Sequence, residues 1–225
     1  MRRPLYRLHI WLGWLVAVPL LLWTLSGLWM VSRPIEEVRG EHLRTPAVPV
    51  AVGGPLAWPQ TGGKTLKSLV IESRPGGAVW IATFTTGEAR RADPVTGNLL
   101  PPVVRSEAVL LARTAYAGSA GVERVSFTPA DRPPLDLRRP RPAWRVAFRD
   151  GTNVYVDGQT GAILALRTTQ WRWFDMMWGL HILDPTGRED TSHPLLIGAA
   201  VLGLAGVVTG IVLLFSRRRK RRAGT

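Results

Sequence analysis

The sequence contains no cysteine. Disulfides, cysteine zinc sites, iron–sulfur clusters and covalently attached c-type haem are therefore excluded. It also lacks the HExxH, G-x-S-x-G and P-loop patterns, which are short signatures of zinc proteases, serine hydrolases and nucleotide-binding enzymes. We therefore predict no catalytic residues, and a binding or structural function is favoured over an enzymatic one.

Charged residues are missing from two long stretches, 8–31 and 194–215. A helix rises ~1.5 Å per residue, so each stretch reaches roughly 33 Å, enough to cross a bilayer core about 30 Å thick. Both stretches are predicted transmembrane helices. The first also follows a basic start, as a signal peptide would. It is longer than the usual signal core of about 7–15 residues and has no A-x-A cleavage pattern, which favours an uncleaved anchor.

Acidic residues are absent outside these stretches, although the chain carries a net charge of +13. Three arginines precede the first stretch and six basic residues follow the second, which leaves 20 basic and 16 acidic residues between them. Basic flanks of this kind mark the cytoplasmic side. We expect both termini in the cytoplasm and the middle on the periplasmic side of a bacterial inner membrane. The basic tail is a stop-transfer flank or a contact with anionic lipid, and no nucleic-acid partner is expected.

The middle of the chain contains an internal repeat at an offset of 64 residues. Residues 80–100 and 144–164 share seven identities without a gap. Trp144, Val146 and Phe148 alternate with polar residues, which predicts a half-buried strand. An Asp-Gly turn and a β-rich return strand follow, so each copy reads as a β-hairpin. Each hairpin ends in a D-x-x-T-G turn, and these turn residues are Asp93, Thr96, Gly97, Asp157, Thr160 and Gly161.

A helix followed by such a hairpin resembles the PepSY domain. The better match is SEAVLLARTAY, a helical candidate over 106–116, followed by AWRVAFRDGTNVYVDGQTGAIL. The first apolar stretch, with His9, Gly13 and Ser26-Gly27, and the segment from WFDMMWGLHILD through the second stretch are similar to the PepSY-associated transmembrane region. The resemblance implies an accessory module that inhibits or assists peptidases. Some larger relatives are haem-bearing ferric-siderophore reductases, which implies haem b as the alternative.

The predicted fold class is α+β, with two transmembrane helices flanking PepSY-like repeats of helix plus hairpin. The tryptophan-rich segment that precedes the second span is predicted to be an interfacial amphipathic helix. The predicted divisions are 1–7 (cytoplasmic), 8–31 (span), 32–63 (Pro/Gly-rich linker), 64–104 (first repeat), 105–168 (second repeat), 169–193 (interfacial helix and connector), 194–215 (span) and 216–225 (cytoplasmic tail).

Histidine is the residue type here that suits iron in haem. His9 lies at the opposite end of the membrane from His181 and His193, so the last two form the pair that is able to share one iron. Asp184 and Asp190 are candidates to orient them or to join a divalent metal site. The alternatives are that these histidines are polar interface residues, that His193 begins a helix, that His9 anchors the interface, and that His42 is an exposed linker residue. We therefore predict no certain cofactor, and no metal site is assigned.

Small residues recur along one face of the second span: Ala199, Gly203, Gly206 and Gly210. Such a face permits close helix contact. It predicts either packing against the first span of the same chain or a homodimer. Asp93 and Asp157 also recur as a pair, but their turn context indicates capping rather than acid–base catalysis.

Overall fold

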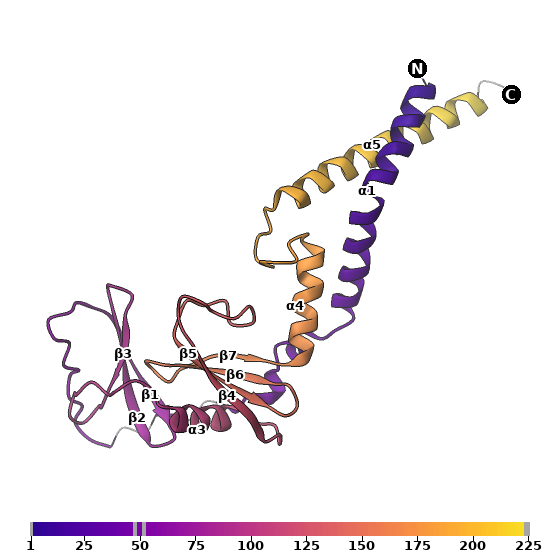
Figure 1. Ribbon diagram of the computed structural model, residues 1–225. Coiled ribbons are helices and arrows are strands. Elements are labelled where there is room, and N and C mark those ends of the chain that lie inside the picture. The colour runs from indigo at the N-terminus through magenta and orange to yellow at the C-terminus, as the bar shows by residue number, and fades with distance from the viewer. Residues whose placement is uncertain (1, 47–48, 51–52, 223–225) are drawn as a thin grey trace. The chain divides into compact units, whose positions relative to one another are not determined.

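The computed structural model describes residues 2–46, 49–50 and 53–222. Two compact units are present, residues 1–34 with 173–225 and residues 35–172. The first unit is helical, and the second holds two antiparallel sheets, one of three strands and one of four (Figure 1). The α+β prediction is therefore confirmed. Two short helical segments, α2 (Ile35–Val38) and η1 (Glu41–Leu43), open the second unit within the predicted linker.

The first unit is built on α1 (Arg2–Val31) and α5 (Pro194–Arg222). Both are long and apolar enough to cross a membrane, over Arg3–Val31 and Pro194–Phe215. Large apolar side chains point outward from them, and Trp14 is 74% exposed, as expected of helices that lipid surrounds. The tryptophan-rich segment forms α4 (Thr169–His181), which begins at the end of the second unit and continues into the first.

The second module, residues 103–168, combines one helix with the four-stranded sheet. Its elements are α3 (Arg105–Ala115), β4 (Val122–Thr128), β5 (Ala143–Phe148), β6 (Asn153–Asp157) and β7 (Ile163–Arg167), in the order β4-β5-β6-β7. The apolar face of α3 carries Ala108, Leu111 and Ala112. It packs against Val146, Phe148, Val154, Val156 and Leu166 in one core. Alternation along β5 and β6 puts these side chains on one face, as the sequence pattern requires.

The Pro-rich loop 129–142 covers the opposite face of this sheet. Leu137 is 2% exposed and packs with Tyr155 and Ala143. The Tyr155 hydroxyl donates to Asp136 Oδ1 at 2.5 Å, and desolvation together with this bond raises the pKa of Tyr155 above its usual value. The loop is therefore a structural cover with its own small core.

The first module, residues 57–100, holds β1 (Leu66–Arg74), β2 (Gly77–Phe84) and β3 (Ala89–Ala92), in the order β1-β2-β3. Its hairpin makes the same backbone bonds as β5–β6, 64 residues later. Phe84 N donates to Glu88 O and Phe148 N to Thr152 O, both at 2.8 Å. The indole of Trp80 donates to Ala57 O at 3.0 Å, and that of Trp144 to Val103 O at 2.8 Å.

The two modules differ in what covers these hairpins. Residues 64–104 hold three strands and no helix, so the predicted helix-plus-hairpin unit is wrong for the first repeat. A strap, residues 57–65, takes the place that α3 has in the second module. The strap begins where Ala57 N donates to Pro94 O at 2.9 Å and ends where Thr85 N donates to Thr65 O at 3.0 Å.

Candidate functional site

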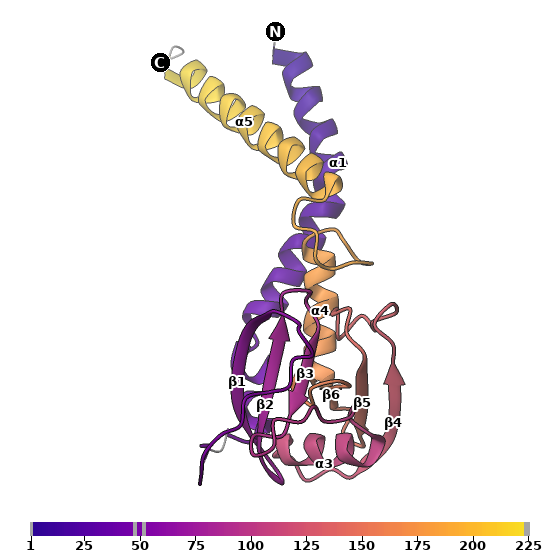
Figure 2. The ribbon, with the colours of Figure 1, turned by 90° about the vertical axis from the view of Figure 1, so that its left-hand side faces the viewer.

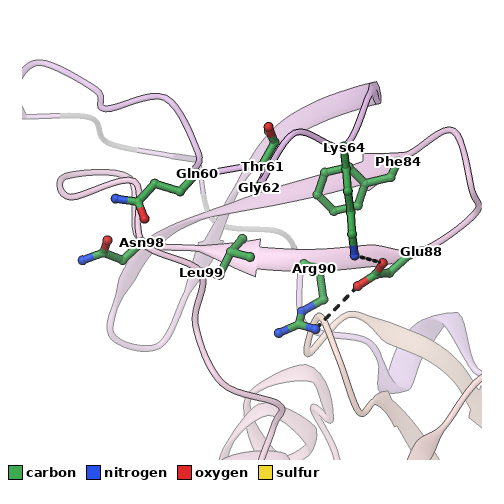
Figure 3. A pocket seen from close by; sticks show the side chains of 9 residues that line it. All are labelled: Gln60, Thr61, Gly62, Lys64, Phe84, Glu88, Arg90, Asn98 and Leu99. Atoms are coloured by element: carbon green, nitrogen blue, oxygen red, sulfur yellow. Dashed lines mark hydrogen bonds and ion pairs between the residues drawn. The ribbon is translucent and has the colours of Figure 1, made fainter.

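A hollow of about 550 Å³ lies between the strap and the β2–β3 hairpin. Figure 3 shows the side chains around it. Phe84 and Leu99 supply apolar surface, and the other lining residues are polar or charged. The full lining set is Gln60, Thr61, Gly62, Lys64, Phe84, Glu88, Arg90, Asn98 and Leu99. Small pockets of mixed apolar and polar character are typical binding sites.

Three charged side chains occupy one end of the hollow. Lys64 Nζ donates to Glu88 Oε2, and Arg90 Nη1 lies 3.5 Å from Glu88 Oε1 (Figure 3). Lys64 also lies over the Phe84 ring, with Nζ 5.5 Å from the centroid. The hydrogen bond from Lys64 holds the pKa of Glu88 below its usual value. Two cations share one carboxylate, so this end carries a net positive charge.

Local backbone geometry holds the strap away from β3. Gly62 and Gly63 adopt φ of 59° and 81°, a left-handed conformation that glycine takes at little cost. This turn brings Lys64 back to the hairpin, where it meets Glu88 and Phe84. The sequence pattern gave one signal of this arrangement, because the return strand 88–92 is poorly apolar compared with 152–156.

The predicted turn residues build the ends of the hairpins. Asp93 Oδ1 accepts from Val95 N at 2.9 Å and from Thr96 N at 2.7 Å, and Gly97 adopts a φ of 73°. These bonds, with the Thr96 amide first, lower the pKa of Asp93. In the second copy Asp157 Oδ1 accepts from Gln159 N at 2.9 Å and from Thr160 N at 2.8 Å, and Gly161 has a φ of 71°. The two aspartates therefore lie in separate turns, each engaged by its own backbone.

His181 lies at the end of α4, against α1. Its Nδ1 is 3.1 Å from both Trp23 O and Ser26 Oγ, and its ring centroid is 5.4 Å from that of Trp23. The Ser26 hydroxyl donates to Leu22 O at 2.6 Å, so it accepts from the imidazole. A carbonyl and an occupied hydroxyl both require the proton on Nδ1. His181 therefore presents the lone pair of Nε2.

Gly27 explains why the Ser26-Gly27 pair ends the first span. A Cβ at this position would lie 3.1 Å from His181 Cε1, closer than ordinary van der Waals contact. Glycine thus allows the imidazole to approach the α1 backbone. The two residues that carried the resemblance at this end of α1 form the seat of His181.

His9 makes the corresponding contact between α1 and α5. Its Nδ1 lies 3.1 Å from Gly206 O and 3.1 Å from Thr209 Oγ1. Thr209 itself donates to Ala205 O at 2.9 Å, so the imidazole again carries its proton on Nδ1. A Cβ on Gly210 would lie 3.0 Å from His9 Cε1. Of the predicted small-residue face, Gly206 and Gly210 therefore meet α1.

The remaining small residues leave space beside α5. A Cβ on Gly203 or Gly206 would meet no heavy atom within 4 Å, and Ala199 is half-buried. The small-residue face is therefore only partly used by α1 of the same chain.

His193 stands at the start of α5. Its carbonyl accepts from Leu196 N at 2.9 Å, and its Nδ1 accepts a long bond from Leu195 N at 3.4 Å. In this arrangement the Nδ1 lone pair faces the helix backbone. Asp184 accepts from Gly187 N at 2.9 Å and also from the amides of Glu189 and Asp190.

Those backbone bonds, with that from Gly187 first, lower the pKa of Asp184 to about 2. Asp190 accepts from Ser192 N at 2.8 Å. Both carboxylates thus fold the connector between α4 and α5. His42 is exposed near the start of the second unit. Among the described residues, no three His, Asp or Glu side chains gather as a metal site.

The family model described as PepSY-associated TM region matches residues 6–225. No curated protein and no solved structure matches the chain. The matched range takes in both candidate spans, both modules and the seats of His9 and His181. The chain belongs to the family of the PepSY-associated transmembrane region.

Proposed function

We propose that this protein is a membrane-anchored binding module that acts on a partner protein and has no catalytic activity of its own. The observation that carries this proposal is the hollow of about 550 Å³ on the first module. It joins apolar surface to an uneven charge at a sheet end, a combination suited to recognising a polypeptide. The second module, which has the same hairpin, fills the matching face with α3.

The proposed orientation places residues 35–172 on the periplasmic side of the bacterial inner membrane and both termini in the cytoplasm. Basic residues flanking the two spans support this arrangement. Lipid then surrounds α1 and α5, and α4 lies at the interface through its tryptophans. Cysteine labelling with a membrane-impermeant maleimide tests it. Ser73→Cys should react in intact spheroplasts, whereas Ser216→Cys should react only after lysis.

A photo-crosslinking experiment tests the binding function. A benzoylphenylalanine at Leu99, which lines the hollow and is 38% exposed, should give a discrete protein adduct in native membranes. The same probe at Val70, on β1 and 52% exposed, should not give that adduct. Adding Arg90→Glu should remove the adduct at Leu99. Identical adducts at both positions, or none at either, would count against the binding module.

The second candidate function is that of a haem b electron-transfer component. The observation that favours it is the tautomer of His9 and His181, since each imidazole donates Nδ1–H to the backbone and keeps Nε2 for iron. A bond of this kind is what orients histidine ligands. His9 and Ser26, where His181 is seated, are 17 residues apart on α1, or about 26 Å at 1.5 Å per residue. One iron therefore cannot take both.

His9 from two copies of the chain would supply both axial ligands of one haem, and the open small-residue face of α5 would permit that dimer. The haem would supply one-electron chemistry, and this chain would hold it and exclude water. The test is the absorption spectrum of detergent-purified protein from haem-replete cells, oxidised and dithionite-reduced. A Soret band with sharp reduced bands that His9→Ala removes supports this function. A featureless spectrum leaves the binding module alone.

A further inference from the structure

The sheet of the first module ends one strand earlier than that of the second. After each D-x-x-T-G turn the chain returns beside its hairpin: Asp93 N donates to Asn98 O at 2.9 Å, and Asp157 N to Ala162 O at 2.8 Å. In the second module the return continues as β7. In the first it makes one more bond, from Leu100 N to Arg91 O at 2.9 Å. Pro101 and Pro102 follow, and proline cannot donate to a ladder.

The position that β7 would occupy in the first module lies next to the hollow. Glu88 O accepts from Phe84 N, so the even-numbered residues of β3 face β2 and the odd-numbered ones face outward. Arg91 O is taken by Leu100. The backbone of Ala89 therefore faces outward at the end of a sheet in which β3 is the last strand. Such an edge is a template for one more strand.

The register of β7 predicts which side chain an added strand would place over the hollow. Val154 pairs with Leu166, and Leu166 is 1% exposed in the core of the second module. Arg90 is the residue 64 positions before Val154, as Phe84 is before Phe148. A strand added to β3 in the register of β7 would thus put one side chain opposite Arg90, on the face of Phe84.

We propose that the outer edge of β3 binds an extended segment of a partner protein in the position of β7, with a carboxylate opposite Arg90. This rests on the proposed binding function and names its partner. Main-chain bonds to β3 provide affinity in this mode, and alternate side chains provide specificity. Lys64 and Arg90 share the single carboxylate of Glu88, so an incoming acid improves the charge balance. An incoming lysine would add a third cation and is disfavoured.

The probes are labelled peptides with the sequence of residues 162–168, which contains β7, in which Leu166 is replaced by Glu or by Lys. Their binding to the full chain in nanodiscs is measured by fluorescence anisotropy, with empty nanodiscs as the blank. The Glu peptide should bind at least about tenfold more tightly than the Lys peptide. Arg90→Glu should reverse that order. The matched control is Arg124→Glu, an exposed arginine on β4, which should leave the order unchanged.

A second variant keeps the test decisive if Arg90→Glu does not fold. Leu99→Glu puts a carboxylate into the hollow without removing either cation, and it should weaken the Glu peptide more than the Lys peptide. Failure of both peptides to bind, or equal binding that ignores Arg90, overturns strand addition. If the Leu99 photoadduct nevertheless forms, the binding function stands with another occupant, such as a helix. If neither result appears, both proposals fall.

Discussion

Replacing Gly97 by alanine should release the strap from the first hairpin. Gly97 has a φ of 73°, and a left-handed alanine costs about 1–2 kcal/mol. Its Cβ would also lie 2.4 Å from the carbonyl oxygen of Trp58. That atom belongs to the backbone, so the strap itself has to move. The strap is held there by Ala57 N to Pro94 O at 2.9 Å and Gln60 N to Gly97 O at 2.8 Å.

Loss of these two hydrogen bonds costs about 1 kcal/mol each, so the full destabilisation by Gly97→Ala is about 3–4 kcal/mol. The matched control is Gly87→Ala, which has a φ of 87° and no heavy atom within 4 Å of the added Cβ. It should cost only the conformational term of about 1–2 kcal/mol. The difference of roughly 2 kcal/mol isolates the contact between turn and strap.

Urea unfolding of the full chain in detergent, followed by tryptophan fluorescence, gives both free energies of unfolding. Hydrogen exchange at the Gln60 amide reports the strap directly and should accelerate in Gly97→Ala but not in Gly87→Ala. Equal destabilisation by the two substitutions, with Gln60 still protected, would refute the assignment of Gly97 to strap attachment.

Three further results are expected. Tyr155→Phe removes a charged hydrogen bond to Asp136 and should lower the free energy of unfolding by about 1.5–3 kcal/mol in urea titrations; an unchanged midpoint would contradict the cover function of loop 129–142. The folded pKa of Asp184 is about 2, below the unfolded value near 3.9, so its contribution to stability is present above pH 4 and is lost as pH falls through 2. Connector amides should stay protected from exchange at pH 3, and deprotection there would argue against these bonds. Gly210→Leu should disturb α1–α5 packing in single chains, detected by loss of an engineered crosslink, whereas Gly203→Leu should change only migration on native gels; the reverse pattern would rule out a free small-residue face.

Regular repetition made the hairpins predictable from sequence. Alternation of Trp144, Val146 and Phe148 marked β5, and the D-x-x-T-G pattern marked turns whose hydrogen bonds the structure repeats at an offset of 64 residues. The two spans were predictable because charge is absent over a bilayer thickness. These signals are local, so they do not depend on which segments meet.

The hollow was not predictable, because it depends on contacts between segments far apart in the chain. Lys64 meets Glu88 only because the strap crosses the hairpin, and nothing in the Pro/Gly-rich composition of residues 32–63 indicates that crossing. β1 was too short and irregular a pattern to assign to a helix or a strand. The seats of His9 and His181 likewise depend on backbone carbonyls of other helices, which no side-chain pattern reveals.

The difference between the two modules supports a division of labour between a closed copy and an open one. Val154 and Val156 meet α3 in the second module, and β7 closes its edge with Leu166, so its binding face is consumed by the chain itself. In the first module the corresponding residues are Arg90 and Ala92, the helix is replaced by the strap, and the returning strand stops at Pro101. A valine at position 90 would bury well against an internal cover, whereas a half-buried arginine is costly unless it is paired. Glu88 supplies that pairing within the chain, and a partner's carboxylate would complete it. The residues that make the first module a poorer match to the repeat are therefore those that suit it to binding another protein.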